Sequence, residues 1–330
     1  MIEQASNAGM DLTQLAGQPF LDPSCPLPVD RPFTASQAEA EGVPRRQLLW
    51  LLGNGFIRRM LKNVYVATQL GDSTLLRCRA LALVVPSDCV VCDRHAGWLL
   101  GAEMILAPNE HLDLRPISVF RPSGHGRLRN SLADSGERNL RPTDIVEVNG
   151  IRVTSPLRTA WDLGRVRYPE PAISGVDAML RLGRFSREEF LDGVERFRRM
   201  RFVTVLRAIA PFADGRAASP GESVLRLRWI EAHLPTPHPQ LEVHRDGVLI
   251  AILDIANNTL RYAAEYDGAE WHTSPEQCEH DRVRRAAVRD EDWVVDAFVA
   301  SDLFGRQQNA EARLRAGAGE ARRKFGSRVA

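Results

Sequence analysis

Two apolar runs near the carboxyl end, with a pair of asparagines between them, constrain the fold of this chain most strongly. The first run spans residues 248–255 and the second spans 260–266, and Asn257-Asn258 lies between them. Asparagine tolerates the left-handed backbone conformation that tight turns require. The pattern therefore predicts two antiparallel strands joined as a β-hairpin.

Three carboxylates lie at the ends of these expected strands. Asp254 is near the end of the first strand, and Glu265 and Asp267 are at the end of the second, where residues two apart face the same side. Strand pairing can bring Asp254 beside them, and clustered carboxylates repel one another unless a cation lies between them. Hard oxygen ligands suit Mg²⁺ or Mn²⁺, so the sequence predicts a metal site at Asp254, Glu265 and Asp267. Solvated strand ends and an Asp-Gly turn are the simpler alternative.

Further elements are expected on both sides of the hairpin. A helix begins at Ser219, carries Glu222 in its first turn and has an apolar stripe that contains Val224, Leu227, Ile230 and Leu234. Another strand is expected around 241–244, a second helix from Asp281, and a last strand from Trp293. The expected order is helix, three strands, helix, strand.

With these elements, residues from about 218 to 303 resemble the Vsr-like branch of the PD-(D/E)xK nuclease superfamily. The resemblance is carried by Glu222, by Asp254, by the block from Glu265 to His272, and by Asp281-Arg282-x-x-Arg285. It implies metal-assisted hydrolysis of phosphodiester bonds. The catalytic residues that it implies are Glu222, Asp254, Glu265, Asp267 and His272.

One position departs from the general superfamily pattern, which has a lysine two residues after the second acid. Here Asp267 takes that position. The resemblance to the Vsr-like branch instead implies that His272 takes part in activating water, because an ordinary histidine pKa of about 6.5 allows proton exchange near neutrality. It also implies that Arg282 and Arg285 bind phosphate oxygens.

The amino-terminal region has a different pattern. Thr34 or Ser36 can cap a short helix, a second helix is expected over 45–52, and two short strands follow at 56–60 and 63–66. Helix, turn, helix and β-wing is the winged-helix arrangement, in which the second helix enters the major groove of DNA.

Residues 32–70 resemble the amino-terminal domain of AbiEi-type antitoxins, which are autorepressors, on the pattern Phe-Thr-x-x-Gln-Ala, Gly-Val-Pro and Gly-Phe-Ile-Arg-Arg-Met. The resemblance implies nucleic-acid contacts from the start of the second helix and from the wing. The residues concerned are Arg45, Arg46 and Gln47, and then Arg58, Arg59 and Lys62. Solvated arginines and a protein-docking module are the alternatives.

The length of 330 residues exceeds the ~250–300 at which single cores usually split, so several domains are expected. We expect an α+β multidomain protein. Its parts are a flexible lead-in at 1–31, a winged helix at 32–70, an α+β middle domain at 71–200, an α/β restriction-endonuclease-like domain of the Vsr type at 215–310, and a tail at 311–330.

The formal net charge of +1 gives no global attraction to nucleic acid, so binding must come from local patches. No run reaches the ~18 apolar residues of a membrane span, and the amino terminus lacks a basic-then-apolar signal. We therefore expect a cytoplasmic protein without membrane partners.

The leading hypothesis is a DNA-binding endodeoxyribonuclease that depends on Mg²⁺ or Mn²⁺. The second is a non-catalytic AbiEi-like antitoxin or transcriptional repressor, in which a degenerate nuclease fold holds DNA, a toxin or another protein partner. A nuclease that acts on RNA is the third, because nothing in the sequence separates DNA from RNA. The three clustered carboxylates favour catalysis, because a binding scaffold does not need them.

Overall fold

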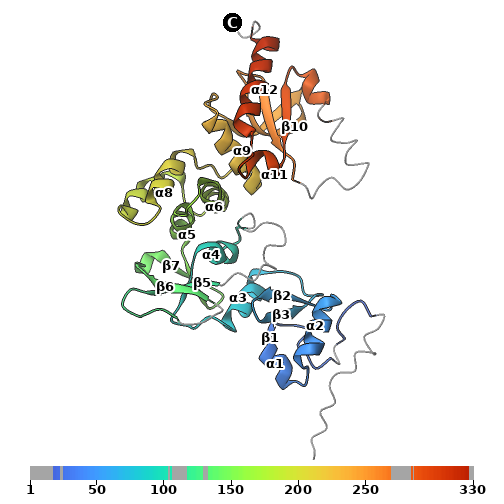
Figure 1. The fold of residues 1–330 in the computed structure, drawn as a ribbon, viewed down its shortest axis with the longest axis vertical. Coiled ribbons are helices and arrows are strands. Elements are labelled where there is room, and N and C mark those ends of the chain that lie inside the picture. Colours follow the sequence, from blue (N-terminus) through green and yellow to red (C-terminus); the bar gives the residue numbers. More distant parts are fainter. Residues whose placement is uncertain are drawn as a thin grey trace, which may run out of the picture. The chain divides into compact units, whose positions relative to one another are not determined.

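The computed structural model of the protein describes residues 18–22, 25–102, 105, 117–128, 133–268, 284 and 286–326. The chain divides into two compact units, one that ends at Thr159 and one that begins at Ala160 (Figure 1). Both units combine helices with β-sheets, which confirms the expected α+β class. The division falls inside 71–200, which the sequence analysis treats as one middle domain.

The amino-terminal unit begins with two helices and a three-stranded antiparallel sheet of order β1-β3-β2. These elements are β1 (Phe33–Thr34), α1 (Ala35–Ala40), α2 (Arg45–Gly53), β2 (Ile57–Leu61) and β3 (Val64–Ala67). Thr34 caps α1, because its hydroxyl accepts a hydrogen bond from the Gln37 N–H while the Gln37 side chain accepts one from the Thr34 N–H. The expected order of two helices and a hairpin is confirmed.

The same unit continues into a five-stranded sheet of order β6-β5-β4-β8-β7. Its elements are α3 (Thr74–Ala82), β4 (Val90–Val91), α4 (Asp93–Leu99), β5 (Ile117–Pro122), β6 (Ala133–Arg138), η4 (Pro142–Asp144), β7 (Ile145–Val148) and β8 (Ile151–Thr154). A buried ion pair at 2.8 Å joins Arg158 to Asp144 in this unit. Arg158 belongs to α5 (Pro156–Gly164), the helix in which the division between the two units falls.

The carboxyl-terminal unit first forms a group of helices and then a four-stranded sheet of order β12-β11-β10-β9. The helices are α6 (Pro169–Arg181), α7 (Arg187–Asp192), η5 (Val194–Phe197), α8 (Val203–Ile209), η6 (Ala210–Phe212) and α9 (Pro220–Glu231). The later elements are β9 (His238–Arg245), β10 (Val248–Asn257), β11 (Tyr262–Tyr266), β12 (Val294–Phe298), α11 (Ala300–Leu303) and α12 (Ala310–Phe325). β9, β10 and β11 pair antiparallel, whereas β11 and β12 run parallel.

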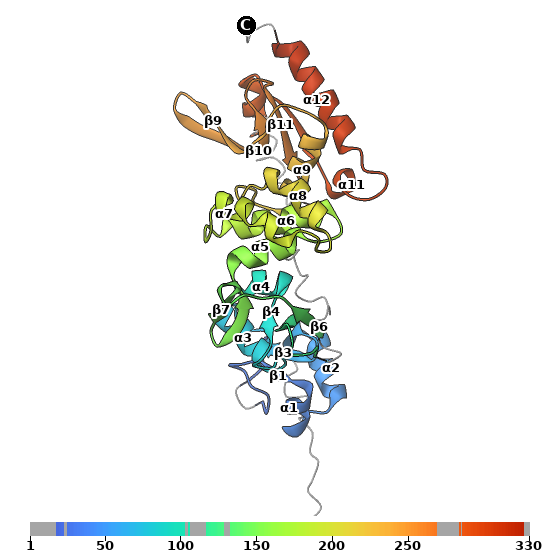
Figure 2. The ribbon, with the colours of Figure 1, turned by 90° about the vertical axis from the view of Figure 1, so that its left-hand side faces the viewer.

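The helices α9 and α12 pack against this sheet (Figures 1 and 2). Trp229 of α9 stacks on Tyr262 of β11, with ring centroids 5.3 Å apart, and Leu314 of α12 belongs to the same buried cluster. A second buried cluster joins β9 and β10 to Val288 and Trp293. Residues 311–330 were expected to form a tail, but α12 instead packs Leu314 into the core of the unit, because small and apolar residues recur on one face of that helix.

None of the helices in the described part of the chain has both the length and the apolar character that a membrane span requires.

Candidate functional site

The amino-terminal end of α9 places Glu222 against the sheet. Ser219 caps the helix, and its hydroxyl accepts a hydrogen bond from the Glu222 N–H at 3.1 Å. Gly221 allows the close approach, because a Cβ at that position would lie 2.1 Å from the Tyr266 ring. The helix therefore begins directly over the end of β11.

The Glu222 carboxylate is buried and has two neutral hydrogen-bond donors. Its Oε2 accepts from the Ala218 N–H at 2.8 Å and from the Gln240 side-chain amide at 2.9 Å. Burial raises the pKa of Glu222 above its ordinary value, although these hydrogen bonds lower it. The sequence analysis missed Gln240, which has a left-handed backbone (φ +53°) within β9, a conformation that sequence pattern does not reveal.

The hairpin brings Asp254 and Glu265 together, as expected. Ile255 pairs with Ala264, so the adjoining positions place Asp254 opposite Glu265. The Tyr266 N–H donates to Oδ2 of Asp254 at 2.8 Å. Burial raises the pKa of Asp254 to about 7, and the charges of Glu222 and Glu265 contribute to this rise while the Tyr266 hydrogen bond opposes it. Three carboxylates from α9, β10 and β11 thus lie within electrostatic range of one another.

An arginine faces this group of acids. Arg284 donates to both carboxylate oxygens of Glu265, at 2.7 and 3.0 Å, and Glu265 is only 3% exposed. Such a bidentate pair is a strong, directional contact. Arg282 and Arg285, which were predicted from the sequence, lie outside the described residues, and Arg284 is not among the predicted residues. One signal could have identified it, because Arg284 precedes the buried Val288 by four positions and so shares its helix face.

We refer to Glu222, Asp254 and Glu265 as the acidic centre. Its ligand chemistry fits a divalent cation, because three carboxylates converge at one place, where Glu222 and Glu265 are buried and Asp254 is half-buried. In the conformation described, however, the structure contains no group of three or more His, Cys, Asp or Glu side chains, among the residues that it describes, that could hold a metal ion. Both oxygens of Glu265 are engaged by Arg284, so binding a cation there requires Arg284 to give way.

Asp267 and His272 are the remaining residues predicted for this region. Asp267 follows β11 directly, and its N–H donates to the Phe298 carbonyl at 2.8 Å, which continues the pairing with β12. His272 lies outside the described residues, so its predicted role stays a prediction.

The residues of α2 that were predicted to contact nucleic acid lie at the start of that helix. Arg45 and Arg46 are exposed, and Gln47 is half-buried. Pro44 precedes them in the capping position and provides no side-chain cap to the first backbone N–H groups. The amino-terminal turn of α2 therefore presents two guanidinium groups and helix-end N–H groups together, which is chemistry that suits a phosphate.

The residues predicted to contact nucleic acid from β2 and the following turn have different surroundings. Lys62 is exposed at the turn. Arg59 lies over the Tyr65 ring, with the guanidinium carbon 5.6 Å from the ring centroid. Arg58 instead donates to the Leu70 carbonyl at 3.1 Å, and burial lowers its pKa. The guanidinium of Arg58 thus holds the chain after β3, a role that the sequence analysis did not foresee.

No model of a known protein family matches the chain. Two proteins of Mycobacterium tuberculosis are similar to it over most of their length. They are "Uncharacterized protein MT2308" of strain CDC 1551 / Oshkosh and "Uncharacterized protein Rv2248" of strain ATCC 25618 / H37Rv. Each is 31% identical over 270 residues, which cover 82% of this chain and 95% of the relative.

Proposed function

The chain belongs to the same family as these two mycobacterial proteins, and we propose that it is a DNA-binding, divalent-metal-dependent endonuclease. In this proposal the carboxyl-terminal unit has a Vsr-like nuclease fold whose acidic centre hydrolyses phosphodiester bonds. Residues 32–70 form a winged helix of the AbiEi type that holds the DNA.

The convergence of Glu222, Asp254 and Glu265 is the observation that supports this proposal most directly. Bringing three carboxylates together with little access to water is costly unless a cation compensates them, and the raised pKa of Asp254, to about 7, reflects that cost. Strongly shifted carboxylates that face one another are typical of functional sites.

The residues of the acidic centre have separate tasks in this proposal. Asp254 and Glu265, with Asp267, would hold Mg²⁺ or Mn²⁺, and Glu222 would complete the shell from α9. When bound, such an ion polarises the phosphate and lowers the pKa of a coordinated water. With such an ion at Glu265, the guanidinium of Arg284 would be available to neutralise charge on the phosphate, because guanidinium groups bind phosphate oxygens as well as carboxylates.

Nicking of supercoiled plasmid DNA tests the catalytic proposal. The wild-type chain should nick DNA with Mn²⁺ or Mg²⁺ and not with EDTA, and Asp254→Asn should lower the rate by at least about a hundredfold, because it removes a charged metal ligand. Glu189→Gln, which changes an exposed acid on α7, is the matched control and should keep the rate. Wild-type activity in EDTA, or a fully active Asp254→Asn variant, would contradict the assignment.

DNA binding by the amino-terminal unit is tested separately. Arg46→Gln should weaken binding and reduce the dependence of log K on log salt by about 0.9 if one phosphate contact is lost. Arg79→Gln, which changes an exposed arginine on α3, provides the control. Equal binding by all three proteins would show that α2 does not contact DNA.

The bidentate Arg284–Glu265 pair favours a second candidate function. An arginine that already compensates Glu265 lets the fold persist without a metal ion, as a non-catalytic antitoxin or repressor requires. In that case the protein would bind DNA, a toxin or another protein partner, with the same affinity in EDTA and in Mn²⁺. Metal-independent DNA binding without cleavage would therefore replace the first proposal with the second.

A further inference from the structure

A hollow of about 750 Å³ lies in the carboxyl-terminal unit between the end of α6, the loop 211–217 and the connection from α9 to β9. Its volume falls within the ~300–1,000 Å³ of typical small-molecule sites. None of the residues of the acidic centre lines it. Its apolar wall is formed by Leu180, Phe185, Phe212, Ile230 and Leu234.

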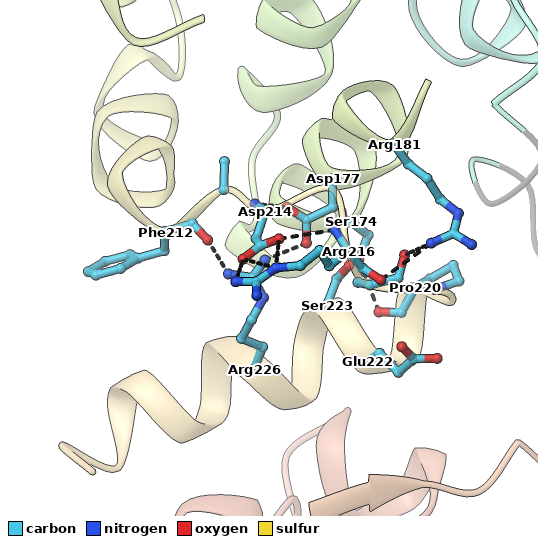
Figure 3. Close-up of polar contacts among 12 residues, drawn as sticks. Ser174, Asp177, Arg181, Phe212, Asp214, Arg216, Pro220, Glu222, Ser223 and Arg226 are labelled. Carbon is cyan, nitrogen blue, oxygen red and sulfur yellow. Dashed lines mark hydrogen bonds and ion pairs between the residues drawn. The ribbon is translucent and has the colours of Figure 1, made fainter. Parts of the chain in front are cut away.

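Arginines hold the loop that forms one wall of this hollow. Arg187 donates to the carbonyl oxygens of Ala213, at 3.1 Å, and of Pro211. Arg226 of α9 donates to the Phe212 carbonyl (Figure 3). These contacts fix successive backbone oxygens of the loop, so the wall is ordered before any ligand arrives, and a ligand does not bear the cost of ordering it.

The polar lining carries more positive than negative charge. Arg226 forms an ion pair with the fully buried Asp177, and Arg216 contacts the Asp214 carboxylate at 2.7 Å (Figure 3). Arg187 bonds to carbonyl oxygens, which are neutral and do not cancel its charge. The lining thus carries three guanidinium groups and one carboxylate, Asp214, with Asp177 buried behind Arg226, and this net positive charge favours an anion.

One buried donor of this lining, the Nε of Arg226, has no hydrogen-bond acceptor among the described residues. The atom is shielded from solvent, and the whole residue is only 3% exposed. Leaving such a donor without an acceptor costs free energy, because water no longer solvates it. Because the atom is closed to solvent, Arg226 contributes positive charge to the lining rather than a hydrogen bond to a ligand.

The lining of the hollow also includes aromatic residues that suit a flat apolar group. Phe212 is 40% exposed although it is a large aromatic residue, and Phe185 lines the same space. Aromatic side chains beside arginines form the arrangement that binds nucleotides by stacking the base and pairing the phosphate.

We propose that this hollow binds a nucleotide, with the base against Phe185 and Phe212 and the phosphate at Arg187 and Arg216. The site is distinct from the acidic centre and goes beyond the proposed nuclease activity. Its ligand is either a free nucleotide or one residue of a nucleic-acid strand, which share this chemistry.

Isothermal titration of AMP into the full chain at low salt tests the proposal. AMP should bind, and adenosine and inorganic phosphate should each bind at least about tenfold more weakly, because each offers only one half of the recognition. Arg216→Gln and Phe212→Ala should each weaken AMP binding about tenfold, since one removes a phosphate contact and the other a stacking surface. Both residues are at the surface (Arg216 side chain 57% and Phe212 40% exposed), so the fold should tolerate these changes.

Two matched controls lie outside the lining of the hollow. Arg207→Gln changes an exposed arginine of α8 that pairs with Glu195, and Phe304→Ala changes a phenylalanine that is 41% exposed. Both should bind AMP like the wild type. Asp254→Asn should do so too, so a failure of the nuclease proposal would leave this result unchanged.

A single-stranded oligothymidylate distinguishes the two sources of the ligand. Strand binding that both lining substitutions weaken, without binding of AMP, would identify the ligand as part of a nucleic-acid chain. Binding of AMP alone would identify a free nucleotide. If neither binds, or if Arg216→Gln and Phe212→Ala leave binding unchanged, the proposal is wrong.

Discussion

Asp177 and Asp254, two carboxylates of the carboxyl-terminal unit, differ in what compensates their charge. Asp177 faces Arg226 and accepts a hydrogen bond at 2.8 Å from the Asp214 N–H. Asp254 faces two further acids, Glu222 and Glu265. Burial is the main cause that raises both pKa values, to about 6 for Asp177 and about 7 for Asp254.

A raised pKa alone therefore does not mark a functional site. Desolvation acts on any buried carboxyl, so the direction of the shift is the same in both places. The sign of the nearest charges separates them. Opposite charge at Asp177 makes a closed structural pair. At Asp254 the charges of Glu222 and Glu265 outweigh the opposing charge of Arg284, and a cation can offset this excess of negative charge.

The largest expected effect on the free energy of unfolding comes from removing one partner of the Arg226–Asp177 ion pair. Arg226→Met should lower the free energy of unfolding by about 3–5 kcal/mol, because it leaves the Asp177 charge buried without its partner. Urea denaturation at pH 8 measures this. The double variant Asp177→Asn with Arg226→Met should recover part of the loss, and a cost below about 1 kcal/mol for the single change would show that the pair is not closed.

The acidic centre should respond in the opposite direction. Asp254→Asn should raise the free energy of unfolding at pH 8 in EDTA, on the order of 2 kcal/mol, because it removes one of three mutually repelling charges. Since the folded pKa of Asp254, about 7, exceeds its ordinary value of 3.8, the folded state binds more protons between these values. Stability of the wild type should therefore fall as the pH rises from about 4 to about 7.

The carboxamide that replaces the carboxyl group in the Asp254→Asn variant does not titrate, so the variant should lose that part of the pH dependence. It should keep the part below about pH 6 that Asp177 contributes. Thermal denaturation across this pH range measures both proteins. Identical pH profiles would show that the neighbours of Asp254 do not disfavour its charged form.

A smaller effect is expected from the arginine that faces the acids. Arg284→Gln should tighten Mn²⁺ binding about tenfold, the equivalent of about 1.4 kcal/mol, because Glu265 loses its competing cation. Titration calorimetry without DNA measures this, with Arg289→Gln as the control on the same helix. Weaker binding in Arg284→Gln would show that the arginine supports the metal site rather than competing with it.

Much of the acidic centre could be predicted from the sequence, because it depends on short-range pattern. The hairpin follows from two apolar runs around Asn257-Asn258, and its register sets Asp254 opposite Glu265. The helix that carries Glu222 follows from its Ser219 cap, but its packing face does not, because Leu225 and Trp229 rather than Leu227 and Ile230 enter the core cluster.

The features that could not be predicted from the sequence depend on contacts between segments that are distant in the chain. Gln240 reaches Glu222 through an unusual backbone conformation, and Arg284 reaches Glu265 from the segment between β11 and β12. The hollow needs the ends of α6 and α9 to meet around the loop 211–217, which no local pattern encodes. The packing of α12 escaped prediction because its glycines and charges indicate a solvated end, although Gly317 lies against Tyr262.

Calorimetric titration of Mn²⁺ into the full chain at pH 8, beside Asp254→Asn, Glu265→Gln and the surface control Glu189→Gln, tests the central claim most directly. The account predicts binding by the wild type and by the control, and at least about a tenfold loss in each variant of the acidic centre. Absence of Mn²⁺ binding by the wild type, with and without a DNA duplex whose scissile phosphates are replaced by phosphorothioates, would contradict it.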